Sequence, residues 1–230
     1  MKNNLMFWLR TFCLYIFLFN FVSASEVFNF DVTEVEIKEN GNKFIGKKGG
    51  IATSIDGTTI KAINFRYDKI KNILIASGNV EINDEQDNIS IYSNKITYFK
   101  NQELIFTEGN SKAINDEVEI DADNFQYNKI LNILKAKGNA RIDNKKENYL
   151  IFSDEITYNR DTEITVTKNN SKAINDGILI TAENFSYSKI DNILNANGKV
   201  ILEDNIEDYI IKANEITYNK SLGKIFTIGK

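Results

Sequence analysis

Histidine and proline are absent from this chain, and its only cysteine, its only tryptophan and both methionines lie within the first 13 residues. A single cysteine, Cys13, excludes an internal disulfide, so stability must come from buried aliphatic, phenylalanine and tyrosine side chains. The rest of the chain also lacks the groups needed for a histidine or cysteine metal site, for Ser-His or Cys-His nucleophiles and for histidine acid–base catalysis.

An excess of basic charge is missing as well. The chain has 28 basic and 32 acidic residues and a formal net charge of −4. Proteins that bind nucleic acid carry a basic face or stripe, which this mixed and mildly acidic composition does not provide. We therefore expect no nucleic-acid partner.

Residues 1–24 have the features of a secretory signal peptide. Lys2 and Arg10 precede an apolar run over residues 11–22, and the small residues Val22, Ser23 and Ala24 at its end suit cleavage by a signal peptidase. An uncleaved anchor helix is the alternative, but the run is short for a bilayer span. The pattern favours export and cleavage after Ala24.

The rest of the chain is dominated by a repeat of about 60 residues that is itself double. AINFRYDKIKNILIASGNVEI starts at Ala62, and close copies start at Ala122 and Ala182. Each half of the repeat opens with the pattern Ile-x-Ala/Ser-x-x-Phe/Ile-x-Tyr, which occurs six times from Ile60 to Tyr218. Units this small cannot bury an apolar face alone, so neighbouring units must share one elongated core.

The spacing within the repeat predicts strands and bulges. Inward residues of the first strand step by two, three and two, so an extra residue is needed to keep them on one face. We expect these bulges near Ile63-Asn64, Asn94-Lys95, Asp123-Asn124, Asp154-Glu155, Glu183-Asn184 and Asn214-Glu215. The second strand alternates strictly, and turn signals such as Asp56-Gly57 separate the strands. The prediction is an all-β, twisted antiparallel fold of about 14 strands, each of roughly ten residues.

Glycine recurs in the middle of the second strand, at Gly78, Gly109, Gly138 and Gly198. A glycine weakens a strand unless its backbone freedom or its missing side chain is required. One interpretation is a tight bend or bulge. The other is a narrow interior in which a side chain would block a ligand.

Candidate catalytic and metal-binding groups are weak. The acidic pairs Asp121/Asp123 and Asp154/Glu155 fall on the outward face by the strand phase, where charged groups are normally solvated. No calcium-loop spacing is present. We expect a protein that is not an enzyme and that binds no metal or cofactor.

The stretches ADNFQYNKILNILKAKGNARI and YLIFSDEITYNRDTEITVTKNNSKAI resemble the OstA-like domain of the lipopolysaccharide transport family. This domain is shared by the periplasmic protein LptA and the amino-terminal region of the outer-membrane assembly protein LptD. The resemblance covers most of the chain from about Thr58 onward. It implies a twisted β-jelly-roll whose apolar interior shields lipid A acyl chains, in the periplasm and in association with the outer membrane.

The resemblance also implies partners: lipopolysaccharide, neighbouring OstA-like modules joined by edge-strand pairing, and an outer-membrane lipoprotein if the chain is of the LptD type. The repeat positions that face inward are the candidate lipid-lining residues: Phe65, Tyr67, Leu74, Ile96, Tyr98, Phe125, Tyr127, Leu134, Ile156, Tyr158, Phe185, Tyr187, Leu194, Ile216 and Tyr218.

The domain organisation expected from the sequence is a signal peptide over residues 1–24, amino-terminal capping or docking strands over 25–57 and the OstA-like repeat domain over 58–230. The last copy breaks off inside a repeat, at Lys224–Lys230, which favours a fragment of the LptD amino-terminal domain over a stand-alone LptA-like bridge protein. A secreted structural or adhesive β-solenoid is the alternative from another class, although its parallel coils disagree with the hairpin turns. A carbohydrate-active enzyme is a third alternative. It would need a carboxylate pair on an inward face, and the strand phase places the acidic residues on the outward face.

Overall fold

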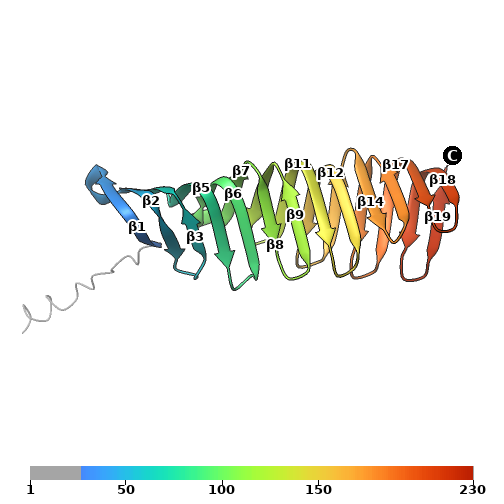
Figure 1. Ribbon diagram of the computed structural model, residues 1–230, viewed down its shortest axis with the longest axis horizontal. Coiled ribbons are helices and arrows are strands. Elements are labelled where there is room, and N and C mark those ends of the chain that lie inside the picture. The colour runs from blue at the N-terminus through green and yellow to red at the C-terminus, as the bar shows by residue number, and fades with distance from the viewer. Residues whose placement is uncertain (1–26, 230) are drawn as a thin grey trace, which may run out of the picture.

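The computed structural model describes residues 27–229, so the predicted signal peptide lies outside the described residues. Figure 1 shows an elongated stack of antiparallel strands that runs from β1 and β2 at one end to β18 and β19 at the other. The strands are β1 (Phe28–Lys38), β2 (Lys43–Ser54), β3 (Thr59–Ala62), β4 (Asn64–Asp68), β5 (Ile73–Asp84), β6 (Ile89–Phe99), β7 (Leu104–Glu108), β8 (Ser111–Ile114), β9 (Val118–Ala122), β10 (Asn124–Asn128), β11 (Ile133–Asn144), β12 (Tyr149–Asn159), β13 (Ile164–Lys168), β14 (Ser171–Asn175), β15 (Ile178–Ala182), β16 (Asn184–Ser188), β17 (Ile193–Asp204), β18 (Tyr209–Asn219) and β19 (Lys224–Ile228). Two short 3-10 turns, η1 (Glu39–Gly41) and η2 (Lys100–Gln102), complete the described elements.

All 19 strands belong to one antiparallel sheet. In five places two short strands follow each other with only a brief break, as β9 and β10 do at Asp123. Counting each such pair as one bent strand gives 14 strands, so the predicted all-β antiparallel fold is confirmed. Among residues 27–229, no helix is long and apolar enough to cross a membrane.

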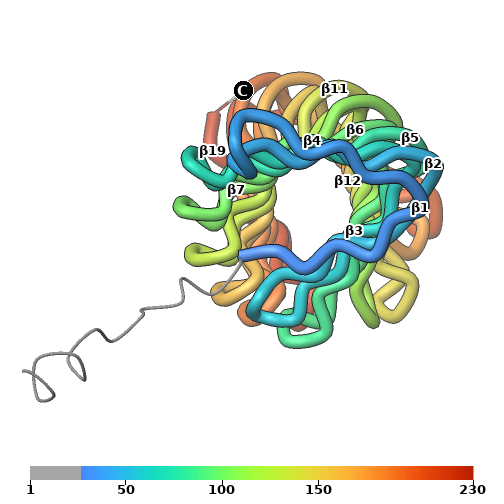
Figure 2. The backbone as a smooth tube through the Cα atoms, turned by 90° about the vertical axis from the view of Figure 1, so that its left-hand side faces the viewer, coloured from blue at the N-terminus to red at the C-terminus, as the bar shows by residue number. Residues whose placement is uncertain are grey.

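The sheet is folded lengthwise around a common axis (Figure 2). We call its two sides wall I and wall II. Wall I contains β3, β8, β9, β14 and β15, and wall II contains β4, β7, β10, β13, β16 and β19. The long strands run through both walls: β11 pairs with β10 over residues 133–137 and with β9 over residues 141–144. The place where a long strand passes from one wall to the other is here called the corner.

The corners lie where the sequence predicts irregular pairing, but the extra residue is on the other strand. Ser77 of β5 pairs with Lys95 of β6, and the next pair is Val80 with Ser93. Two residues of β5, Gly78 and Asn79, therefore oppose one residue of β6. Both have a left-handed backbone, with φ of 84° and 49°. The prediction of a bulge at the Asn94-Lys95 position was thus wrong about the strand that carries it.

The same geometry decides between the two interpretations of the glycines. Gly78 adopts a positive φ, and a Cβ built on it would come within 2.9 Å of the Ile63 side chain. Ile63 is exposed, so the crowding is on the outside of the corner and not in the interior. The bend interpretation is confirmed, and the glycines do not line a ligand channel.

Backbone hydrogen bonds continue around the corner. The Ile63 N–H donates to the Gly78 carbonyl at 3.1 Å, and the Asp123 N–H donates to the Gly138 carbonyl at 2.9 Å. The two walls are therefore joined on this side by the chain itself and by a hydrogen-bonded ladder. The corner is therefore the side of the fold on which backbone hydrogen bonds hold the two walls together.

Candidate functional site

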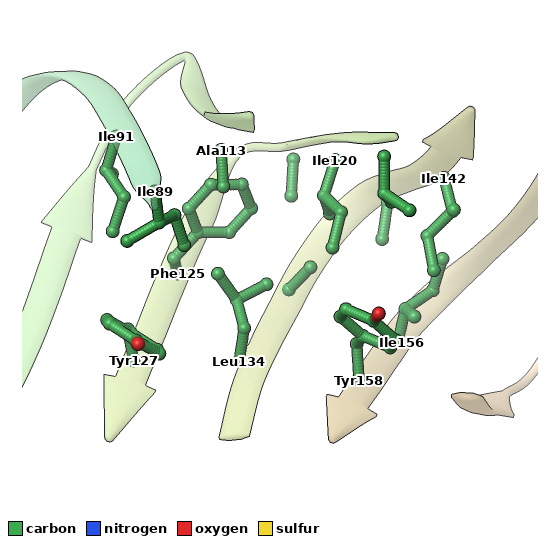
Figure 3. Close-up of a cluster of buried hydrophobic side chains, with 14 of the residues drawn as sticks. Ile89, Ile91, Ala113, Ile120, Phe125, Tyr127, Leu134, Ile142, Ile156 and Tyr158 are labelled. Carbon is green, nitrogen blue, oxygen red and sulfur yellow. The ribbon is translucent and has the colours of Figure 1, made fainter. Parts of the chain in front are cut away.

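The interior between the walls holds the residues that the sequence singled out. Of the fifteen candidate lining residues, fourteen are buried and Tyr218 is partly buried. In Figure 3 the side chains of wall I, such as Ile120 and Ile142, point toward those of wall II, such as Leu134 and Tyr158. The inward phase predicted from the repeat is therefore confirmed, whereas contact with lipid stays a prediction.

Most of the interior is filled by these side chains. Phe28 of wall I meets Tyr67 of wall II edge to face, with ring centroids 5.1 Å apart. Farther along, Tyr149 and Tyr187 make the same kind of contact at 5.4 Å. An acyl chain can enter such a packed core only where the walls separate or where packing leaves space.

The side of the molecule opposite the corner is built differently, and we call it the seam. Here turns of wall I face turns of wall II. The wall I turns span residues 54–58, 84–88, 114–118, 144–148, 175–178 and 204–208, and the wall II turns span residues 39–42, 68–72, 99–103, 128–132, 159–163, 188–192 and 219–223. Within the part of the chain that the structure describes, no backbone–backbone hydrogen bond joins a turn of one wall to a turn of the other. Side chains alone close the seam.

Basic residues provide most of this closure. The residue two positions after each repeat tyrosine is basic in all six half-units: Lys69, Lys100, Lys129, Arg160, Lys189 and Lys220. At one end of the seam, Lys129 binds Asp84 at 2.7 Å and Asp56 at 3.1 Å, and Lys100 binds Asp56 at 2.7 Å. In each pair the lysine comes from wall II and the aspartate from wall I.

The middle and the far end of the seam are closed less uniformly. Lys189 binds Glu117 of wall I and Glu163 of its own wall, both at 2.8 Å. Arg160 instead donates to the Tyr127 hydroxyl at 3.0 Å and to the Asp87 carbonyl, and Lys220 donates to the Glu147 carbonyl at 3.3 Å. Neither Arg160 nor Lys220 pairs with a carboxylate of the described residues.

Ionisation at the seam follows these contacts. Partial burial disfavours the charged form of Asp84, yet the hydrogen bond from Lys129 outweighs it and lowers the Asp84 pKa below its usual 3.8. Lys129 shows the matching change: burial opposes its charge, but Asp84 and Asp56 raise its pKa above 10.5. Hydrogen bonds from Lys146 and then Lys189 lower the pKa of Glu117 to about 2. Asp84, Lys129 and Glu117 are thus charged at neutral pH.

Sequence reasoning missed the seam, although its signal was present. The Tyr-x-Lys/Arg spacing recurs as faithfully as the inward apolar pattern. A basic residue at a turn is normally solvated, and only the closing of the sheet shows that the five basic positions from Lys100 to Lys220 face the other wall. The acidic residues Asp123 and Asp154, by contrast, are exposed on the outward side of the corner, as predicted.

A pocket leads into the interior near the carboxyl-terminal end of the seam. Its apolar wall is formed by side chains of both sheet walls: Tyr149, Ile151, Ile180, Tyr187, Leu194 and Tyr218. Its polar lining residues Asn175, Asn192 and Lys220 belong to the seam turns. No cluster of three acidic, histidine or cysteine side chains that would hold a metal ion occurs among residues 27–229.

These features define the class of the protein: an antiparallel β-jelly-roll with an apolar interior, built from repeated half-units. Residues 59–164 match the family described as LptA/(LptD N-terminal domain) LPS transport protein. Residues 59–164 therefore have the features of an OstA-like domain of the lipopolysaccharide transport family.

Among solved structures, the chain is similar to LptH, the LptA homologous periplasmic component of the conserved lipopolysaccharide transport device from Pseudomonas aeruginosa. The match has 16% identity, covers 48% of this chain and 82% of that chain, and has a TM-score of 0.45. No curated protein matches the chain in sequence.

Proposed function

We propose that this protein shields the acyl chains of lipopolysaccharide in its interior and passes the lipid across the periplasm toward the outer membrane, without catalysing a reaction. The observation that carries the proposal is the contrast between the two sides of the fold. The corner is held by the chain and a backbone ladder, whereas the seam is held by side chains. Parting the walls at the seam exposes a continuous apolar interior and breaks no strand pairing.

This arrangement matches the chemistry of an amphiphile. Acyl chains gain by leaving water for an apolar interior, at about 0.8 kcal/mol for each buried methylene. A charged and glycosylated headgroup cannot enter that interior and must stay in water. A jelly-roll that opens along one side lets both conditions be met at once, because the headgroup remains outside the seam.

The two ends of the stack support an extended conduit. Within the described residues, β1 pairs only with β2, and β19 pairs only with β18, so each end presents an unpaired strand edge. Exposed apolar residues lie on both edges, including Val35 on β1 and Phe226 on β19. We expect residues 25–57 to act as capping or docking strands and the edges to pair with other OstA-like modules. This role suits both an LptA-like bridge protein and an LptD amino-terminal domain, and in the second case an outer-membrane lipoprotein is the expected partner.

Site-specific photo-crosslinking tests the lipid path. A benzoylphenylalanine at Phe125, Ile156 or Tyr187 faces the interior, whereas one at Lys135 lies on the outward face of the neighbouring strand. In cells that make lipopolysaccharide, the inward positions should give lipopolysaccharide adducts and Lys135 should not. Capture at Lys135 with none at the three inward positions would show that the lipid does not use the interior.

A reversible lock tests the opening of the seam. The described residues contain no cysteine, so a pair introduced at Glu117 and Lys189, which face each other across the seam, can be bridged by a cleavable bis-maleimide. The bridge should abolish lipopolysaccharide capture at Ile156, and cleavage should restore it. A matched bridge between Lys95 and Glu108, which pair within one wall, should leave capture unchanged. Full capture with the seam bridged would contradict lateral opening.

Edge pairing has its own test. Cysteines at Val35 and Phe226 in separate copies should form an intermolecular disulfide under mild oxidation if β1 of one copy pairs with β19 of the next. A cysteine at Tyr92, which is exposed on β6 away from both ends, should not trap such a dimer with Val35. Equal trapping at Tyr92 and Phe226 would argue against pairing at the edges.

A further inference from the structure

Two equivalent sites on the seam, 60 residues apart in the sequence, differ in their hydrogen bonding. The first surrounds Tyr127. Its hydroxyl lies 3.2 Å from Asp87 Oδ2 and 3.3 Å from Asn132 Oδ1, and it accepts a hydrogen bond from Arg160 at 3.0 Å. The aromatic ring fills the interior while the hydroxyl is held by three polar groups at the seam. Hydrogen bonds therefore join the two walls at this first site.

The second site has the same groups one repeat later. Tyr187, Glu147, Asn192 and Lys220 stand at the positions of Tyr127, Asp87, Asn132 and Arg160. Yet the Tyr187 hydroxyl is buried and has no hydrogen-bond partner among the described residues. Its burial, and then the nearby Tyr149 and Glu147, raise its pKa. A buried hydroxyl without a partner is costly, so its persistence calls for an explanation.

The charge at this second site is also incompletely matched. The Lys220 ammonium donates to the Glu147 carbonyl oxygen and pairs with no carboxylate of the described chain. The carboxylate of Glu147 itself lies 3.9 Å from Lys189. Lys189 is held in turn by Glu117 and Glu163, so it is already balanced. Lys220 is therefore a seam cation with hydrogen-bonding capacity left for an added anion.

The apolar pocket described above lies at this second site. Tyr187, Asn192 and Lys220 all line it, and its remaining wall is made of aliphatic and aromatic side chains such as Leu194 and Ile180. Residues that carry a cation, an amide and a buried hydroxyl thus line an apolar pocket between the two walls. Cations bind anionic oxygens, and amide and hydroxyl donors bind ester or amide carbonyls.

We propose that the opening between Tyr187, Asn192 and Lys220 is a side-entry site for the head-to-chain junction of an anionic lipid. Lys220 binds the anionic group of the lipid, Tyr187 and Asn192 donate to polar oxygens at the junction, and the first part of the chain lies against Leu194 and Ile180. This site rests on the proposed function, because it assigns to one place on the seam the entry of the lipid that the interior shields.

Calorimetric titration with dodecyl phosphate below its micelle concentration tests the site, with dodecanol and inorganic phosphate as separate probes. The wild-type protein should bind dodecyl phosphate, and more tightly than either separate probe. Lys220→Gln should weaken dodecyl phosphate binding roughly tenfold and Tyr187→Phe about fivefold, because each removes one hydrogen-bond donor to the ligand. Binding of dodecanol should not change in Lys220→Gln.

Two control variants make these results specific. Lys168→Gln removes an equal charge from an exposed position on β13 and should bind like the wild type. Tyr187→Phe should unfold at or above the wild-type temperature because its buried hydroxyl has no partner to lose, whereas Tyr127→Phe should unfold at a lower temperature and keep wild-type binding. Wild-type affinity for dodecyl phosphate in both Lys220→Gln and Tyr187→Phe would overturn the site. So would equal affinity for inorganic phosphate, which would show an anion site without a chain.

The failure of this site is distinguishable from the failure of the proposed function. If dodecyl phosphate does not bind while Phe125 and Ile156 still capture lipopolysaccharide, the entry site is wrong and the conduit stands. If neither probe nor lipopolysaccharide contacts the interior, both are wrong. Capture of lipopolysaccharide at Ile178, which lines the pocket on β15, together with weakened binding in Lys220→Gln, supports both.

Discussion

Replacing Lys129 by methionine should destabilise the fold more than removing any exposed lysine. The Lys129 side chain is only 11% exposed and bridges Asp84 and Asp56, and its ammonium also donates to the Thr58 hydroxyl at 2.8 Å. Methionine keeps much of the aliphatic volume but removes the charge and the donors. The Asp84 side chain, 5% exposed, is then left without its cation.

The size of the effect follows from what remains. Removing one partner of a buried ion pair typically costs about 3–5 kcal/mol, because the other charge stays buried and uncompensated. Asp84 keeps hydrogen bonds from the Thr58 hydroxyl and the Asp87 backbone N–H, and Asp56 keeps Lys100. We therefore expect the low end of the range, about 3 kcal/mol of unfolding free energy.

The loss should depend on pH in a defined direction. The Asp84 pKa is lowered in the folded protein, so its contribution to stability is complete above the unfolded value of about 3.9 and is lost as pH falls toward the folded value. The Lys129 pKa is raised, so its contribution is complete below about 10.4 and is lost at higher pH. The difference between wild type and Lys129→Met should be constant between about pH 5 and pH 10 and should shrink on either side.

Urea denaturation followed by tyrosine fluorescence and circular dichroism measures this difference. Lys95→Met is the matched control, because Lys95 and Glu108 form an exposed pair at 2.7 Å that should contribute at most about 1 kcal/mol. Equal losses in the two variants, or a loss in Lys129→Met that does not shrink as the pH falls below about 4, would refute the account of a buried, ionised seam.

Two further predictions concern the corner and the interior. Gly78→Ala should cost about 2 kcal/mol, because alanine disfavours a φ of 84° and its Cβ meets Ile63, whereas Gly57→Ala, with φ of 89° but open space around it, should cost about 1 kcal/mol. Equal costs would show that the Ile63 contact is unimportant. Ile156→Ala should cost about 3–4 kcal/mol by leaving a cavity in the core, and Ile130→Ala, at an exposed turn position, should stay within about 0.5 kcal/mol of wild type. Thermal unfolding of the four variants measures both, and a tolerant Ile156→Ala would mean that the interior is loosely packed.

Much of the fold was predictable because strand phase is a local property. Alternation with period two places Leu74, Ala76 and Val80 on one face of β5 whatever the rest of the chain does. The face change at the corner was also visible in the sequence. Its assignment to one strand was not, because a mismatch of one residue between partners is satisfied by a bulge on either. The Gly78-Asn79 pair, two residues suited to positive φ, was the signal that decides it.

The seam escaped prediction for a different reason. Its contacts join residues far apart in the sequence, such as Lys129 with Asp56 and Lys189 with Glu117. The local strand period does not determine which residues meet across the seam. The stagger between the two walls of the folded sheet determines it. The row of basic residues could be read from the repeat, but its partners appear only once the sheet has closed on itself.

The seam residues also differ along the molecule in a way that bears on its opening. Near the amino-terminal end, Lys100 and Lys129 each bind carboxylates of wall I and are largely buried. Farther along, Lys189 still binds the Glu117 carboxylate, but Arg160 and Lys220 reach only neutral oxygens of wall I, and the pocket lies beside Lys220. Bonds between opposite charges are stronger than those between a charge and a carbonyl, so we expect separation of the walls to be easiest beside Lys220. The basic positions recur in every half-unit, but the strength of closure depends on which oxygen the opposite turn presents.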